Sequence, residues 1–138
     1  MKLSISEVLK RADAIKDVEK RKQFLLEHDS PAIHAIFKAA YDPKIKFLLP
    51  EGPAPYKPSD FDDLEGRLYT EMRKMYLFVE GGHPGLTKVK REQLFIDLLE
   101  SVDPQDAALL VSIKDKKLPY KHITQAFVRK AYPGLIES

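Results

Sequence analysis

Apolar residues recur at helical spacing from the start of the chain. The first such stretch keeps one helical face apolar through Ile5, Val8, Leu9, Ala12 and Ile15. Ser4 and Glu7 stand three residues apart at its beginning, the spacing of a capping box, in which each residue bonds a free N–H of the first turn. This pattern predicts an amphipathic helix near the N-terminus.

Two further helices are expected before residue 43. One carries Val18, Phe24 and Leu25. The next begins at Ser30 as N-cap with Pro31 at the first helical position, where the missing N–H costs nothing. It ends near Asp42-Pro43, and its expected buried residues are Ile33, Ile36, Phe37 and Ala40.

The middle of the chain is divided by proline and glycine. Residues 50–58, PEGPAPYKP, contain too many prolines for a helix or a central strand, so we expect an ordered loop in which Tyr56 contacts the body. Ser59 or Asp60 should cap a helix that Gly81–Gly85 stops. Its expected inward residues are Leu64, Leu68, Met72, Met75 and Tyr76.

The last part of the chain predicts three more helices. Thr87 should cap one of them, and Asp103-Pro104 should begin the next. The residues expected to be buried in these two are Val89, Leu94, Phe95, Leu98, Leu99, Ala107, Leu110 and Ile113. A third, short helix runs up to Tyr132 and stops at Pro133. With no convincing period-2 stretch, the chain is expected to fold as one compact, all-α, multi-helix domain over residues 1–138.

Composition narrows the class of protein. The 138 residues are 43% hydrophobic and 32% charged, as in ordinary globular domains. Cysteine is absent, which excludes disulfides, thiolate catalysis and cysteine-based zinc sites and fits a reducing compartment. No apolar run is long enough for a signal peptide or a membrane span. We therefore expect a cytoplasmic protein that does not bind membranes.

Acidic residues and histidines give no enzymatic pattern. Asp60, Asp62, Asp63 and Glu65 are expected in the first turn of a helix, where carboxylates oppose the positive end of the helix dipole. They lack EF-hand spacing, and the four histidines form no metal-binding pair. The glycines follow a helix rather than a strand, so they are not a phosphate loop. We expect no metal, no cofactor and no catalytic activity.

Cations cluster near the C-terminus although the net charge is only +2. The connector between the last two helices carries Lys114, Lys116, Lys117 and Lys121. One interpretation of these lysines is a solvated loop opposite the negative end of the preceding helix, and the other is a phosphate-binding surface. On a helical wheel Lys121, Gln125 and Arg129 share one face with His122 beside them, while Lys130 lies nearer the apolar side. This arrangement favours phosphate binding.

A second cationic group begins the helix after the glycines. Lys88, Lys90 and Arg91 oppose the helix dipole there, so local stability does not explain them. Such a conflict indicates a binding role.

The chain's ending resembles that of a known domain. The helix that runs through Lys130 and Tyr132 into Pro133-Gly134-Leu135-Ile136 is similar to the end of the N-terminal DNA-binding domain of phage-type ATP-dependent DNA ligases. The order of segments also corresponds, including 18–23, 35–42 and 49–52, so the resemblance covers nearly the whole chain loosely.

The resemblance implies sequence-independent binding of double-stranded DNA through phosphates and sugars across the minor groove. By position it carries over Lys114 with its connector and the stretch His122 to Tyr132. The connector departs from the ligases at Leu118-Pro119-Tyr120. Ligases also need a Lys-x-Asp-Gly motif for the lysyl-AMP intermediate, and this sequence has none, so ligation by this chain is excluded.

Two functions follow as expectations. The first is a non-catalytic DNA-binding module of phage replication or repair, located in the host cytoplasm. Its expected contacts are Lys114, Lys116, Lys117, Lys121, His122, Gln125 and Arg129, with Lys88, Lys90 and Arg91 as a second group. The alternative is an adaptor that binds a replication or transcription protein. It predicts an exposed apolar surface near Phe47, Leu48, Leu49 and Tyr56.

Overall fold

The protein is all-helical, as the periodicity predicts. The computed structural model describes residues 3–61 and 64–136. In these ranges the only β-pairing is one isolated antiparallel bridge between Phe47 and Val79. The helices are α1 (Ile5–Ala14), α2 (Val18–Glu27), α3 (Pro31–Tyr41), α4 (Arg67–Glu71), the 3-10 helix η1 (Met72–Phe78), α5 (Lys88–Ser101), α6 (Pro104–Lys114) and α7 (Gln125–Ala131).

Polar caps fix where most of these helices begin. A Ser, Thr or Asp side chain before the first turn accepts a backbone N–H, which stabilises a helix by about 1 kcal/mol. The predicted caps Ser4, Ser30, Thr87 and Asp103 are confirmed. Asp17 and Thr124 cap α2 and α7 in the same way.

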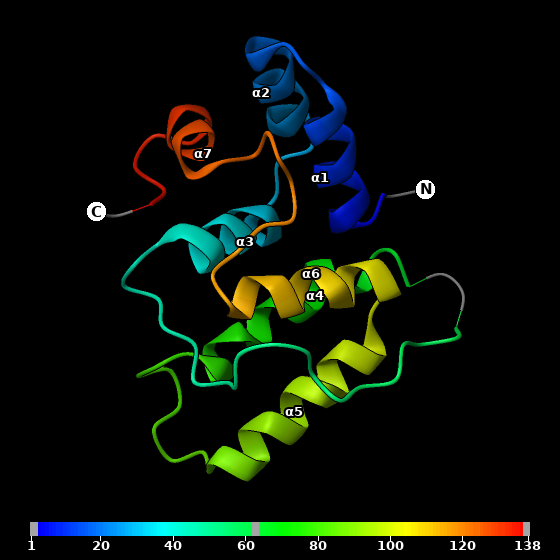
Figure 1. Cartoon of the computed structure of the whole chain (residues 1–138), viewed down its shortest axis with the longest axis vertical. Helices are drawn as coiled ribbons and strands as arrows, with labels where there is room; N and C mark the ends of the chain where they lie inside the picture. Colours follow the sequence, from blue (N-terminus) through cyan, green and yellow to red (C-terminus); the bar gives the residue numbers. More distant parts are fainter. Residues whose placement is uncertain (1–2, 62–63, 137–138) are drawn as a thin grey trace.

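Helices α3 and α6 lie across the middle of the molecule, with α1, α2 and α7 on one side and α5 on the other (Figure 1). Helix α6 packs against α1, α3 and α5, so apolar residues surround most of its circumference. Its side chains Ala107, Leu109, Leu110 and Ile113 are at most 1% exposed. The core therefore runs through the centre of the chain's fold and connects both sides.

The helix expected from residue 59 begins later and changes form. Ser59 Oγ accepts the N–H of Phe61 instead of capping a helix, and α4 starts only at Arg67. From Met72 the chain is a 3-10 helix, whose side chains three residues apart align. Met72, Met75 and Phe78 are therefore buried, while Tyr76, expected inward, is 53% exposed.

Two other expectations on this fold are corrected or limited. Val89, expected to be buried, is 79% exposed, because it lies in a first turn that faces solvent. Of the acidic cluster, Asp60 and Glu65 precede α4 rather than occupy its first turn. Asp62 and Asp63 lie outside the described residues.

The proline-rich loop is ordered by contacts with α5 and α6, which it crosses in Figure 1. Ala54 and Tyr56 pack against the core, so the expectation that Tyr56 holds the loop to the body is confirmed. The backbone N–H of Gly52 donates to Asp115 Oδ2 (3.1 Å) and that of Lys57 to Glu100 Oε2 (2.7 Å). The loop is thus part of the folded body.

The glycine-rich turn after η1 folds back on that helix. Gly82 lies so close to η1 that a Cβ at this position would stand 1.9 Å from the carbonyl oxygen of Tyr76. Gly81 has a φ of +83°, a conformation that side chains disfavour. These two glycines stop the helix, as predicted, and allow the close approach.

Candidate nucleic-acid interface

The connector that holds the predicted site begins at the end of α6. Lys116 adopts a left-handed backbone conformation (φ 61°). Its N–H donates to Ile113 O (2.8 Å) and the N–H of Lys117 donates to Ser112 O (3.0 Å), which closes the last turn of α6. Glycine is the usual residue in this conformation after a helix, because other residues adopt it with strain. A lysine at this position indicates that its side chain has a role.

The Lys116 side chain is partly buried and is bound to the end of α3. Its Nζ donates to the carbonyl oxygens of Ala39 (2.6 Å), Asp42 (2.8 Å) and Ile45 (2.8 Å) at the end of α3. It also lies 5.9 Å from the centre of the Phe47 ring. Burial lowers the pKa of this ammonium, with the Asp42 carboxylate opposing the shift. Lys116 therefore joins the connector to α3 and is not free to contact phosphate.

Lys114 has the same structural role on the other side of the connector. Its side chain is 3% exposed, and its Nζ bonds Gly52 O (2.6 Å) and Asp115 Oδ1 (2.9 Å). The proline-rich loop is thereby fixed to α6. Because the Lys114 ammonium group is already paired and enclosed, it cannot reach DNA. Lys114 is therefore not among the proposed DNA contacts.

Arg91 is also a structural cation. Its Nε donates to Leu77 O (3.1 Å) and its Nη2 donates to Leu86 O (3.1 Å), which ties α5 to both ends of the glycine-rich turn. Only 8% of the residue is exposed. The position of this cation in the first turn is explained by these carbonyls.

The remaining C-terminal candidates are exposed, but they do not share one helix. Helix α7 begins at Gln125, so Gln125 and Arg129 stand one turn apart on it, while Lys121 and His122 lie in the preceding turn. The backbone N–H of His122 donates to Asp13 Oδ1 (2.7 Å), which holds this turn against α1. The expectation of a continuous helical face including Lys121 is thus wrong, although the side chains remain close in sequence and exposed.

Lys88 and Lys90 are exposed at the opposite end of the molecule. Figure 1 places the beginning of α5 and helix α7 at opposite ends of the long axis. The structure therefore keeps Lys88 and Lys90 apart from the exposed residues of α7.

The Pro-Gly-Leu-Ile ending secures α7 to the body. The Tyr132 ring is buried against Phe37 and His34, with ring centres 5.5 Å and 5.1 Å apart. From α2, Arg21 stands 5.1 Å over the ring of Phe127. Ile136 is 6% exposed. The aromatic residue of this ending, Tyr132, is thus a packing residue, and Lys130, expected at the apolar rim, is exposed.

Positive and negative residues are distributed very unevenly in the C-terminal part of the chain. Residues 116–136, the C-terminal cationic segment, contain five Lys or Arg residues and no Asp or Glu. Within the described residues, none of Lys117, Lys121 and Arg129 forms an ion pair. These three cations are accordingly available to an anionic partner.

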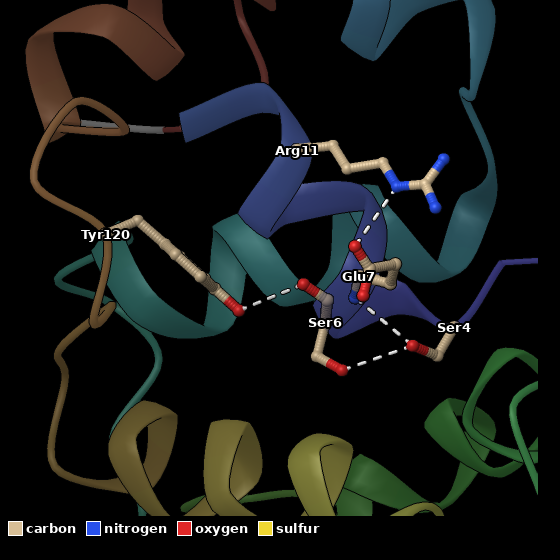
Figure 2. Close-up of polar contacts among 5 residues, drawn as sticks. All are labelled: Ser4, Ser6, Glu7, Arg11 and Tyr120. Atoms are coloured by element: carbon tan, nitrogen blue, oxygen red, sulfur yellow. Dashed lines mark hydrogen bonds and ion pairs between the residues drawn. The ribbon is translucent and has the colours of Figure 1, made fainter. Parts of the chain in front are cut away.

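A buried polar cluster beside the connector was not foreseen. Figure 2 shows Tyr120 reaching from the connector to the carbonyl of Ser6 (3.4 Å), and the hydroxyls of Ser6 and Ser4 in contact (3.2 Å). The N–H of Ser6 donates to Asp106 Oδ1 (2.8 Å), and Asp106 is fully buried. Burial raises the pKa of Asp106 to about 6, with hydrogen bonds from Ser6 opposing the shift.

This cluster joins α1, α6 and the connector, and the Asp106 side chain within it is fully buried. Asp106 occupies the first turn of α6, where the sequence suggests only an interaction with the helix dipole. Its burial depends on Ser6, 100 residues away, so local sequence carries no indication of it.

Metal binding and membrane insertion have no support in the described residues. No group of three or more His, Cys, Asp or Glu is arranged there to hold a metal ion. Within the same ranges, no helix has the length and apolar character needed to span a bilayer.

Comparison with known proteins identifies a family. A search of curated proteins gives no match. Residues 8–120 match DUF6433, described as a family of unknown function. The match ends before α7 and so leaves out the Pro-Gly-Leu-Ile ending. Because it covers most of the 138 residues, the chain belongs to the DUF6433 family.

Proposed function

We propose that this protein is a non-catalytic module that binds duplex DNA without sequence preference through its C-terminal cationic segment. The observation that carries the proposal is the combination of exposed, unpaired Lys117, Lys121 and Arg129 with the absence of any carboxylate from residues 116–136. The resemblance of the ending to ligase DNA-binding domains supports the same partner.

The proposed contacts are made with the phosphate backbone. Lys117, Lys121 and Arg129 supply charge, and His122 and Gln125 supply hydrogen-bond donors beside them. Phosphate contacts position a protein on DNA without reading sequence. Three cations would release roughly three counterions, so affinity should be modest and should fall with a log–log salt slope of about −3.

The proposed role is binding only. The sequence has no Lys-x-Asp-Gly motif, and the buried Asp106 cluster is closed to substrate. The resemblance extends the proposal to phage DNA replication or repair in the host cytoplasm.

Fluorescence anisotropy with a short labelled duplex tests this proposal. Two duplexes of unrelated sequence, one of them also in nicked form, are titrated with the protein at several salt concentrations. Equal affinities for the two sequences and a linear loss of log affinity with log salt are expected. An absence of binding at low salt, or strong preference for one sequence, would contradict it.

A protein-binding adaptor is the second candidate, favoured by a different surface. Leu48 is 41% exposed, as that alternative predicts, although Phe47, Leu49 and Tyr56 are partly buried against the core. Val89, also exposed, lies at the same end of the molecule.

A further inference from the structure

A second surface lies at the end of the molecule opposite α7. Residues 43–51 and 79–91, the α5-end surface, contain five Lys or Arg residues and two Glu residues. Two large aliphatic side chains are exposed on it, Leu48 at 41% and Val89 at 79%. Large exposed aliphatic side chains on a cationic surface indicate a site of interaction.

The backbone under this surface is held in place. The N–H of Leu48 donates to Phe78 O (2.8 Å) and the N–H of Glu80 donates to Lys46 O (2.8 Å). Because side chains alternate along this extended segment, Lys46 and Leu48 point to solvent while Phe47 and Leu49 pack against the core. The outward pair is thus presented by a fixed segment.

A groove separates this segment from α5. It has a volume of about 420 Å³ and is lined by Leu48, Leu49, Pro50, Lys88 and Arg91. Leu48, Leu49 and Pro50 give the groove an aliphatic floor. The hydrogen bonds of Arg91 go to neutral carbonyl oxygens, so its positive charge is not neutralised by a carboxylate. Lys88 also lines the groove. A ligand with an apolar group next to an anionic group would contact the aliphatic residues with the first and the cations with the second.

Charge and shape together distinguish among partners. A DNA backbone gains nothing from covering Leu48 and Val89, because phosphates and sugars offer no apolar group of matching size. A peptide with a large apolar side chain flanked by Asp or Glu buries these aliphatic groups and pairs with the lysines. Glu51 and Glu80 are fewer than the cations, which leaves the surface net positive.

We propose that the α5-end surface is a docking site for a short acidic peptide segment of a partner protein, which places an apolar side chain in the groove lined by Leu48, Leu49 and Pro50. Lys46, Lys88 and Lys90 contact its carboxylates. Its proposed contacts are distinct from Lys117, Lys121 and Arg129, while Lys116 of the C-terminal cationic segment bonds Ile45 O within the same surface.

Nuclear magnetic resonance of the ¹⁵N-labelled full chain tests the site with defined probes. The first probe is a ten-residue peptide of Glu and Asp around a Leu-Phe pair. The second replaces the Leu-Phe pair with Ser-Ser, and the third replaces the acids with Lys. Only the first should shift amide signals, and the shifts should concentrate in residues 46–49 and 88–91.

Matched variants sharpen the test. Leu48→Ser with Val89→Ser should weaken binding of the first peptide about tenfold, since two aliphatic contacts are lost. Val18→Ser with Leu26→Ser removes two exposed aliphatic residues (45% and 44%) from α2 and should leave affinity unchanged. Unperturbed amide spectra outside each substituted region show that both variants fold.

Three results would overturn the inference. They are no shift with the acidic peptide at millimolar concentration, equal binding of the Lys peptide, or shifts confined to α7. A DNA duplex that shifts residues 46–49 and 88–91 more than the acidic peptide does would assign this surface to DNA instead.

Discussion

At the residue scale, the cations of this protein divide by what their charged ends contact. Lys114, Lys116 and Arg91 bond backbone carbonyls and are buried or partly buried, whereas Lys117, Lys121 and Arg129 are exposed, with one long hydrogen bond from Arg129 Nη1 to Ile136 O (3.5 Å). The sequence does not distinguish the groups, because the acceptors of Lys114 and Lys116 lie 62 to 77 residues away. Of the ten expected contacts, three thus have a structural role, five are kept as proposed DNA contacts, and Lys88 and Lys90 belong to the α5-end surface.

Substitution of Lys116 tests that structural role. Lys116→Met should lower the free energy of unfolding by about 2–3 kcal/mol, because three carbonyls at the end of α3 lose a charged donor. Lys117→Met, its exposed neighbour, should change it by less than about 0.5 kcal/mol. Urea denaturation measures both. Equal stability of the two variants would show that the carbonyl contacts contribute nothing.

Asp106 should make stability depend on pH. Its pKa rises from 3.8 to about 6 on folding, so the folded state binds this proton more tightly than the unfolded state. The stabilising contribution is complete below about pH 4 and is lost as the pH rises through 6, by up to about 3 kcal/mol. The substitution Asp106→Asn removes this pH-dependent contribution to the free energy of unfolding.

The corresponding measurement is the unfolding free energy of wild type and Asp106→Asn between pH 4 and pH 7.5. The variant should gain stability relative to wild type as the pH rises through this window. Asp97→Asn, on an exposed carboxylate of α5, serves as the control. A difference between wild type and Asp106→Asn that is constant with pH would contradict the raised pKa.

At the element scale, the sequence predicts helix beginnings better than helix form. Ser4, Ser30, Thr87 and Asp103 are caps in the structure because capping depends on residues within one turn. The 3-10 form of η1 could not be foreseen, since apolar residues three apart fit both kinds of helix. Tertiary packing with the glycine-rich turn distinguishes the two forms here.

Gly82 provides a test of that packing. Gly82→Ala places a Cβ 1.9 Å from the Tyr76 carbonyl oxygen, so η1 or the turn must move, at a cost of about 1–3 kcal/mol. Gly85→Ala is the matched control, because its Cβ would meet nothing closer than 3.9 Å. Thermal unfolding distinguishes them. Similar melting temperatures for the two variants would refute the close approach of turn and helix.

At the scale of the whole molecule, α7 and the beginning of α5 lie toward opposite ends of the long axis (Figure 1), while the C-terminal cationic segment starts between them, where Lys116 bonds Asp42 O and Ile45 O. The all-α class was predictable from periodicity, but the separation of the surfaces depends on how α5 and α7 pack around α3 and α6. The two ends also differ chemically, since a groove lined by Leu48, Leu49 and Pro50 lies beside cations of the α5-end surface. This difference leads to separate proposals for DNA and for an acidic peptide.

The most direct test compares two triple variants in the salt-dependent DNA-binding assay. Lys117, Lys121 and Arg129 are changed to Ala in one, and Lys46, Lys88 and Lys90 in the other, so both lose the same charge. The first should reduce the log–log salt slope by about 2–3, while the second should keep most of the wild-type slope. A slope that is unchanged in the first variant, or reduced equally in both, would contradict DNA binding by the C-terminal cationic segment.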